Sequence, residues 1–161
     1  MHSTDPAKDI HAFDEALTAH REREYGDHFI DFVFPGRVNF RDITFTRNAD
    51  FSGATFNDRA DFEDVQFLKR ASFHGVKFLG IANFSRAKFT WGANFQEAIF
   101  TEHADFRGTN FSAAAYFWDA LFNKRAIFAG ATFTQESYFG RATFTEAAEL
   151  GFQALSAENF R

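Results

Sequence analysis

The residues of this chain whose types could do chemistry are its histidines and its regularly spaced carboxylates. The six histidines are His2, His11, His20, His28, His74 and His103. No two of them are four residues apart and no HExxH-type spacing occurs, so the ligand pattern of a helical zinc site is missing. His20 and Glu24 are four residues apart, but they lie in a charge-rich segment that we interpret as a solvated face. We therefore predict no metal site.

Three aspartates, Asp50, Asp61 and Asp105, each stand directly before a phenylalanine. Paired carboxylates can act as general acid and base. Here the carboxylates recur at one fixed position of a repeat, which favours a structural role: they face water and bond the backbone of the next corner. The chain also has no glycine-rich phosphate loop and no nucleophile elbow. We therefore predict no catalytic and no cofactor-binding residues, and a protein that is not an enzyme and needs no cofactor.

Composition and charge indicate where the protein works. There is no cysteine, which is typical of a protein in a reducing cytoplasm. Residues 1–5 begin no apolar signal segment, and no stretch approaches the roughly 18 apolar residues of a membrane helix. A formal net charge of −5 argues against the basic face that nucleic acid requires. We predict a cytoplasmic protein that contacts neither membrane nor nucleic acid directly.

The elements that would position these side chains follow from a repeat. Phenylalanine occurs 26 times, and from Phe40 to Phe144 its spacing alternates between five and six residues without exception. Two residues before each Phe stands a small side chain, usually Ala, and the residue between them is polar or variable. Small-in, polar-out, large-in alternation has a period of two, which is the period of a strand and not of a helix.

Each strand is followed by two or three residues of turn-competent type, such as 57–59 and 123–125. The repeating unit is five plus six, or eleven, residues. Two units with four strands close one coil of 22 residues, and coils stack about 4.8 Å apart. The repeat then gives five to six coils, a rod of roughly 25–30 Å. A two-sided coil of eleven residues is the alternative, but two closely packed sheets would have to hold two Phe rings per turn.

The repeat resembles the pentapeptide-repeat family, whose motif is a small residue, Asp or Asn, Leu or Phe, and two polar or small residues. The clearest matches are Ala49–Gly53, Ala82–Arg86, Ala93–Glu97 and Ala104–Gly108. The resemblance covers about residues 38–149 and implies an all-β solenoid, a right-handed quadrilateral β-helix. The extra residue at every second corner resembles a Phe-rich subgroup, and it should bulge two opposite corners.

The two ends of the chain depart from the repeat. We predict an N-terminal capping segment over 1–37 that contains an amphipathic helix at 5–25, with the β-helix over 38–149. Ile10, Phe13 and Leu17 share one face of that helix, which we expect to cover the open strand edges of the first coil. Residues 150–161 form either the last coil or a C-terminal cap.

Because a core filled with Phe leaves no pocket, the sequence favours a rigid interaction scaffold. The resemblance also implies an alternative: some pentapeptide-repeat proteins mimic duplex DNA, bind DNA gyrase or topoisomerase, and confer quinolone-type resistance. That role needs a strongly negative face. Residues 38–160 hold 14 Asp and Glu against 12 Lys and Arg, a difference of only −2.

Outward positions that lie one coil apart should form columns, and apolar residues occur in several columns of the C-terminal half. They are Ile99, Tyr116, Trp118, Leu121, Ile127 and Tyr138. Because these apolar residues should lie together on adjacent faces, we predict a contact surface for another protein. The simplest partner is a second copy in a two-fold dimer.

Overall fold

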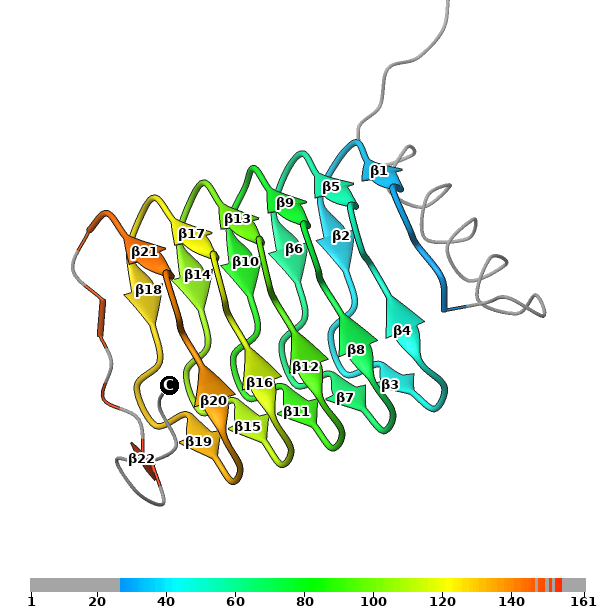
Figure 1. Ribbon diagram of the computed structural model, residues 1–161. Coiled ribbons are helices and arrows are strands. Elements are labelled where there is room, and N and C mark those ends of the chain that lie inside the picture. Colours follow the sequence, from blue (N-terminus) through cyan, green and yellow to red (C-terminus); the bar gives the residue numbers. More distant parts are fainter. Residues whose placement is uncertain (1–26, 147, 150, 152, 155–161) are drawn as a thin grey trace, which may run out of the picture.

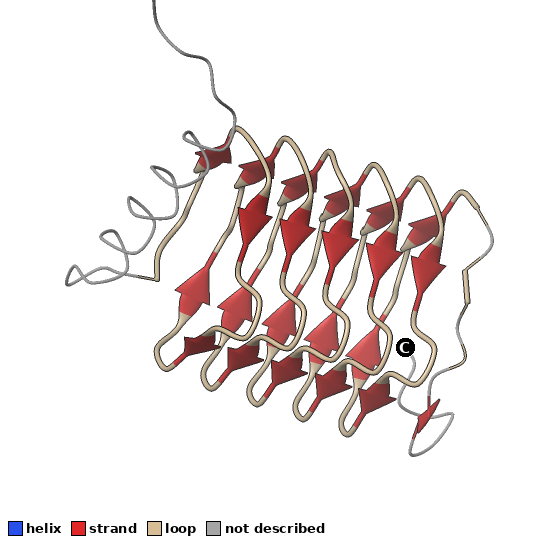
Figure 2. Cartoon of the chain, turned by 180° about the vertical axis from the view of Figure 1, so that it is seen from behind, coloured by secondary structure: helices blue, strands red, loops and turns tan. Residues whose placement is uncertain are grey.

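The computed structural model describes residues 27–146, 148–149, 151 and 153–154, and this part of the chain is an all-β solenoid. Short parallel strands form four flat faces around one core, and the coils follow one another along a single axis (Figure 1). The same four rows of strands are visible from behind (Figure 2). Each strand is two residues long and pairs the outward residue either with the small residue before it, as in Ala49–Asp50, or with the Phe after it, as in Thr55–Phe56.

We number the faces I to IV in chain order, starting from the face on which His28 bridges to Asp50. Face I contains β4 (Ala49–Asp50), β8 (Ala71–Ser72), β12 (Ala93–Asn94), β16 (Ala115–Tyr116) and β20 (Ser137–Tyr138). Face II contains β1 (Val33–Phe34), β5 (Thr55–Phe56), β9 (Lys77–Phe78), β13 (Ile99–Phe100), β17 (Leu121–Phe122) and β21 (Thr143–Phe144). Face III contains β2 (Val38–Asn39), β6 (Ala60–Asp61), β10 (Ala82–Asn83), β14 (Ala104–Asp105) and β18 (Ala126–Ile127). Face IV contains β3 (Thr44–Phe45), β7 (Gln66–Phe67), β11 (Lys88–Phe89), β15 (Asn110–Phe111), β19 (Thr132–Phe133) and β22 (Gln153–Ala154).

The strand register confirms the four-sided coil. Ala82 pairs with Ala104, and Phe56 pairs with Phe78, so every strand from β1 to β17 pairs with the fourth strand after it along the chain. A two-sided coil would pair each strand with the second strand after it. The described residues therefore form about five four-sided coils of the predicted length, and identical repeat positions lie on top of one another. The right-handed sense of the coil stays a prediction from the family resemblance.

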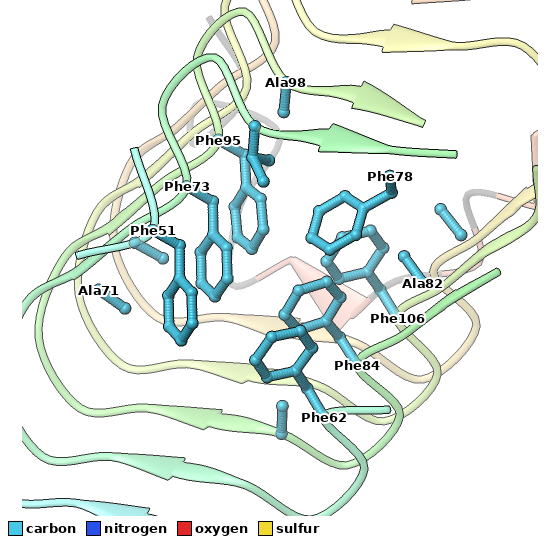
Figure 3. Close-up of a cluster of buried hydrophobic side chains, with 14 of the residues drawn as sticks. Phe51, Phe62, Ala71, Phe73, Phe78, Ala82, Phe84, Phe95, Ala98 and Phe106 are labelled. Atoms are coloured by element: carbon cyan, nitrogen blue, oxygen red, sulfur yellow. The ribbon is translucent and has the colours of Figure 1, made fainter. Parts of the chain in front are cut away.

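The core consists of four ladders of phenylalanine rings, one for each face. Figure 3 shows Phe51, Phe73 and Phe95 from the face I ladder beside Phe62, Phe84 and Phe106 from the face III ladder. Phe95 lies parallel to Phe73 at 4.8 Å and to Phe117 at 5.0 Å. The face I and face III ladders meet at right angles, as Phe84 and Phe95 do at 5.3 Å and 87°. Parallel contacts along a ladder and edge-to-face contacts between ladders are both favourable arrangements of aromatic rings. The small residues of the repeat are buried beside the rings from Ala49 to Ser137, as predicted.

The two corner types follow the alternating spacing of the repeat. Where Phe residues are five apart the corner is tight: Ala98 N donates to Phe95 O at 3.2 Å. The second residue after the Phe then has a positive φ, as Gly75 (62°) and Glu97 (58°) do. Where the spacing is six, the extra residue lies in a wider corner without a positive φ. The prediction that two opposite corners carry the extra residue is confirmed.

Glycine in the tight corners should stabilise the protein because it adopts a positive φ easily, and not because of side-chain contacts. A Cβ added at Gly75 has open space around it, so only the left-handed conformation penalises alanine there. We expect Gly75→Ala to lower the free energy of unfolding by about 1–2 kcal/mol. Gly36→Ala is the matched control, because its Cβ also meets nothing but its φ is not in the left-handed region. Urea denaturation of both variants checks this. Equal stabilities would contradict a conformational cost.

The first coil of the solenoid begins before residue 38, the start that the sequence predicted. His28 bridges to Asp50, and the buried rings of Phe29 and Phe34 stack on Phe51 and Phe56 at 4.9 and 4.4 Å. Residues 28–37 are therefore part of the solenoid and not of a separate capping segment, which corrects the boundary at residue 37. The predicted helix at 5–25 lies outside the described residues.

At the C-terminal end, β22 pairs with β19 and extends face IV, so the segment left open between coil and cap contributes to the last coil. Its register differs from the rest: Thr132 pairs with Gln153, one residue short of a full coil. On face III the spacing is still that of a full coil, since Ile127 bridges to Glu149. The connection between faces III and IV is therefore one residue shorter in the last coil. As a result Phe133 pairs with Ala154, whereas the repeat predicts that it pairs with the residue after Ala154.

Candidate interaction surface

The structure brings five of the six predicted surface residues onto two adjacent faces. Tyr116 and Tyr138 are neighbours on face I, and Ile99 and Leu121 are neighbours on face II. Trp118 lies in the tight corner that joins these two faces. We call these five residues the aromatic corner.

The aromatic side chains of this corner form an ordered cluster. The rings of Tyr116 and Tyr138 are parallel, with centroids 5.1 Å apart and planes 2° from each other. Trp118 meets Tyr138 edge to face at 5.8 Å. The residue beside Trp118 in the next coil is Gly140, where an added Cβ would lie 3.1 Å from the indole Nε1. The glycine thus makes room for the indole, which remains 45% exposed.

Ile127, the sixth predicted residue, does not join this cluster. It lies on face III, between Asp105 and Glu149 in the adjacent coils. The wide corner 123–125 separates that face from Leu121. Ile127 is therefore a single, half-buried apolar side chain among acidic neighbours, which is common on protein surfaces.

Several exposed apolar side chains are not among the residues predicted from the sequence. Four of them lie in wide corners: Leu68, Leu79, Ile81 and Trp91 are 39%, 44%, 37% and 49% exposed. Three more, Ile30, Phe32 and Val33, lie in the first coil. The sequence contains the information needed to find these corner residues, because residues in successive corners recur at the same one-coil spacing as residues in successive strands. Exposed apolar residues are therefore not confined to the C-terminal half.

The predicted structural role of the repeat carboxylates is confirmed. Asp50 Oδ1 accepts a hydrogen bond from Ser52 N at 3.0 Å, and Asp105 Oδ1 accepts one from Arg107 N at 3.0 Å. Asp61 also accepts from the amide of Asn83 in the next coil at 3.0 Å. These bonds link neighbouring coils and tie each strand to its corner. Among the described residues no group of three His, Cys, Asp or Glu could hold a metal ion.

Arginines pair with aspartates of the neighbouring coil at two corners of the rod. On the corner after face III, Arg86 reaches down one coil and holds Asp64 with two hydrogen bonds of 2.9 and 2.7 Å. Arg141 holds Asp119 in the same way, at 2.7 and 2.6 Å. The hydrogen bonds from these guanidinium groups lower the pKa of both Asp64 and Asp119. Such exposed pairs add little stability, but they balance the negative charge of Asp64 and Asp119.

A shallow hollow of 520 Å³ lies on face III. Its lining residues are Arg59, Glu63, Ile81, Asn83, Ser85, Arg86, Asp105, Arg107 and Gly108. The arginines that line it already form ion pairs: Arg107 contacts Asp105, Arg86 contacts Glu63, and Arg59 contacts Asp61 beside the hollow at 3.1 Å. No nucleophile stands beside a base among these lining residues. The hollow therefore offers neither reacting groups nor unpaired guanidinium donors.

Comparison with known families gives one match: a model described as pentapeptide repeats, in nine copies, fits residues 29–77 and 73–121. The two stretches together span 29–121, more than half of the chain. Comparison with curated proteins and with solved structures finds no match. In the described residues there is no helix long and apolar enough to cross a membrane. The matched repeats coincide with the stacked coils and the Phe ladders. The chain belongs to the pentapeptide-repeat family.

Proposed function

We propose that this protein is a non-enzymatic interaction scaffold whose contact site is the aromatic corner. The supporting observation is the cluster of Tyr116, Trp118 and Tyr138, held by ring contacts at the junction of two flat faces. Tyr and Trp are enriched among the residues that dominate binding energy in protein interfaces. Their order before binding lowers the entropic cost of association.

The simplest partner for the aromatic corner is a second copy of the chain. A two-fold axis through the corner would bring each Trp118 against the other copy's Tyr138 or Leu121, giving a self-complementary contact. Leu121 and Ile99 on face II would supply the aliphatic part of the interface, and Asp119 and Arg141 its polar rim. The flat faces of the solenoid allow such a contact without rearrangement of the backbone.

Charge on the rod favours this scaffold over the gyrase-binding alternative. A DNA mimic presents rows of unpaired carboxylates, whereas Asp64 and Asp119 each bind an arginine here. Glu63 likewise pairs with both Arg41 and Arg86. These three carboxylates are therefore balanced by arginines, which supports the scaffold over a DNA mimic.

The double variant Tyr116→Asp with Leu121→Asp tests the proposed dimer. We expect the wild type to sediment as a dimer at micromolar concentration and the double variant as a folded monomer. Two buried carboxylates in the interface should weaken association by at least about 100-fold, because an unpaired charge is costly to desolvate. Ile127→Asp, on another face, is the control and should remain dimeric. A wild type that stays monomeric at high concentration would leave only a foreign partner for this surface.

A further inference from the structure

A second surface feature lies in the wide corner between faces IV and I. Leu68, Lys69 and Arg70 form this corner in one coil, and Trp91 lies in the next coil, in the column of Lys69. We call these four residues the basic corner. Lys69 Nζ lies 5.1 Å from the centre of the Trp91 ring, so the indole is held under a cation. Leu68 and Trp91 are still 39% and 49% exposed.

The charges of the basic corner differ from most of those elsewhere on the rod. Eight of the other basic residues form ion pairs: Arg41, Arg47, Arg59, Arg86, Arg107, Lys124, Arg125 and Arg141. Within the described residues Lys69 and Arg70 have no carboxylate partner, and segments 66–72 and 88–94 contain no Asp or Glu. Two adjacent cations therefore stand uncompensated in a protein whose formal net charge is −5.

Small residues on the C-terminal side leave the basic corner accessible. Ala113 and Ala114 occupy the next coil of this corner, directly beyond Trp91 and Gly92. Across the corner, the outward residues of face I in these coils are the uncharged Ser72 and Asn94. The residues next to Trp91 on these two sides are therefore small or uncharged.

We propose that the basic corner binds an acidic segment of another protein, one that also carries an aliphatic or aromatic side chain. Lys69 and Arg70 would take its carboxylates, since Arg in particular forms strong charge-assisted bonds with them. Its apolar side chain would pack on Trp91 and Leu68, which together provide the kind of anchor found at interface centres. This site is independent of the aromatic corner, because it lies on a different edge of the rod and in earlier coils.

An anionic membrane fits these observations less well. Each Lys or Arg near such a surface strengthens binding by roughly fivefold, and stable attachment needs a second signal such as an acyl chain. Two cations are few for this purpose, and the net charge of the chain opposes approach to an extended anionic surface. A short acidic segment contacts only the corner itself.

Binding can be followed through Trp91. The chain has two tryptophans, so the Trp118→Phe variant makes Trp91 the sole indole reporter. The probe is a synthetic peptide of repeated Glu-Glu-Leu triplets. We expect it to change Trp91 fluorescence at micromolar concentrations, and to bind less tightly as salt is raised. The same peptide with Gln in place of Glu should bind at least about tenfold more weakly, since charged hydrogen bonds are the stronger ones.

Matched variants make the test specific to this corner. Lys69→Glu with Arg70→Glu should weaken peptide binding by at least about 30-fold, because attraction becomes repulsion. Lys77→Glu is the matched control: it lies outward on β9 in the same coil as Lys69, is exposed, and should change binding by less than about twofold. Circular dichroism would show that the parent and both variants are folded.

The proposal is overturned if the Glu-Glu-Leu peptide fails to bind, or if it binds the Lys69→Glu, Arg70→Glu variant as tightly as the parent. It is also overturned if vesicles of phosphatidylserine in phosphatidylcholine bind through Lys69 and Arg70 while the peptide does not. That result would assign the corner to a membrane surface.

Discussion

Replacing Phe95 with alanine is expected to lower the free energy of unfolding by about 3–5 kcal/mol. The ring is fully buried, stacks between Phe73 and Phe117 in its own ladder, and meets Phe84 and Phe106 edge to face. These neighbours are fixed to strands by backbone hydrogen bonds, so they cannot collapse into the space. The variant therefore loses the burial of the ring and leaves a cavity.

Phe144→Ala is the matched control for this experiment. Phe144 ends its ladder in β21, where it is half-buried and stacks on Phe122 alone within the described chain. We expect it to cost less than half as much as Phe95→Ala, because fewer contacts are lost and solvent can fill the gap. Urea denaturation followed by circular dichroism measures both. Equal losses, or a Phe95→Ala variant as stable as the wild type, would contradict the ladder as the main source of stability.

Enlarging the small column should be damaging for the opposite reason. Ala93 is buried and lies between Ala71 and Ala115 in the parallel register of face I. A leucine there must displace rings that already touch one another. We expect Ala93→Leu to destabilise the protein by about 1–3 kcal/mol, the usual cost of overpacking a dense core.

The Lys77→Leu variant tests whether the loss of stability comes from the inward position of the leucine or from its size alone. It introduces the same side chain at an outward, exposed position on β9, where it meets solvent instead of the ladders. A change within about 0.5 kcal/mol is expected for this control. Thermal or urea unfolding of the two leucine variants separates the cases. An Ala93→Leu protein that unfolds together with the control would mean that the column is loosely packed.

Much of the architecture was determined by the sequence alone. The alternating five- and six-residue spacing of the Phe side chains predicted strands, two kinds of corner and a coil of four strands. This was possible because stacked coils impose one environment on every equivalent position, so the same residue pattern recurs in every coil. Columns such as Tyr116 beside Tyr138 and Ile99 beside Leu121 followed by simple counting, and the register confirms both.

Only the tertiary structure decided what happens at the corners and the ends. Trp91 and Leu68 are exposed because a wide corner points them outward, and Arg86 binds Asp64 because its side chain spans two coils. Thr109 occupies a small position in the core, where its hydroxyl donates to Phe84 O at 2.8 Å. These outcomes depend on side-chain direction and on the coil below, which no single repeat specifies.

The first coil of the solenoid and the pairing register of its last strand also could not be read from the repeat pattern. Phe29 and Phe34 join the ladders because the coil above offers them matching rings. At the other end, β22 pairs one residue out of step with the repeat. A repeat pattern is reliable where coils lie on both sides. At a terminal coil one neighbour is missing, so contacts with the remaining neighbour set the register.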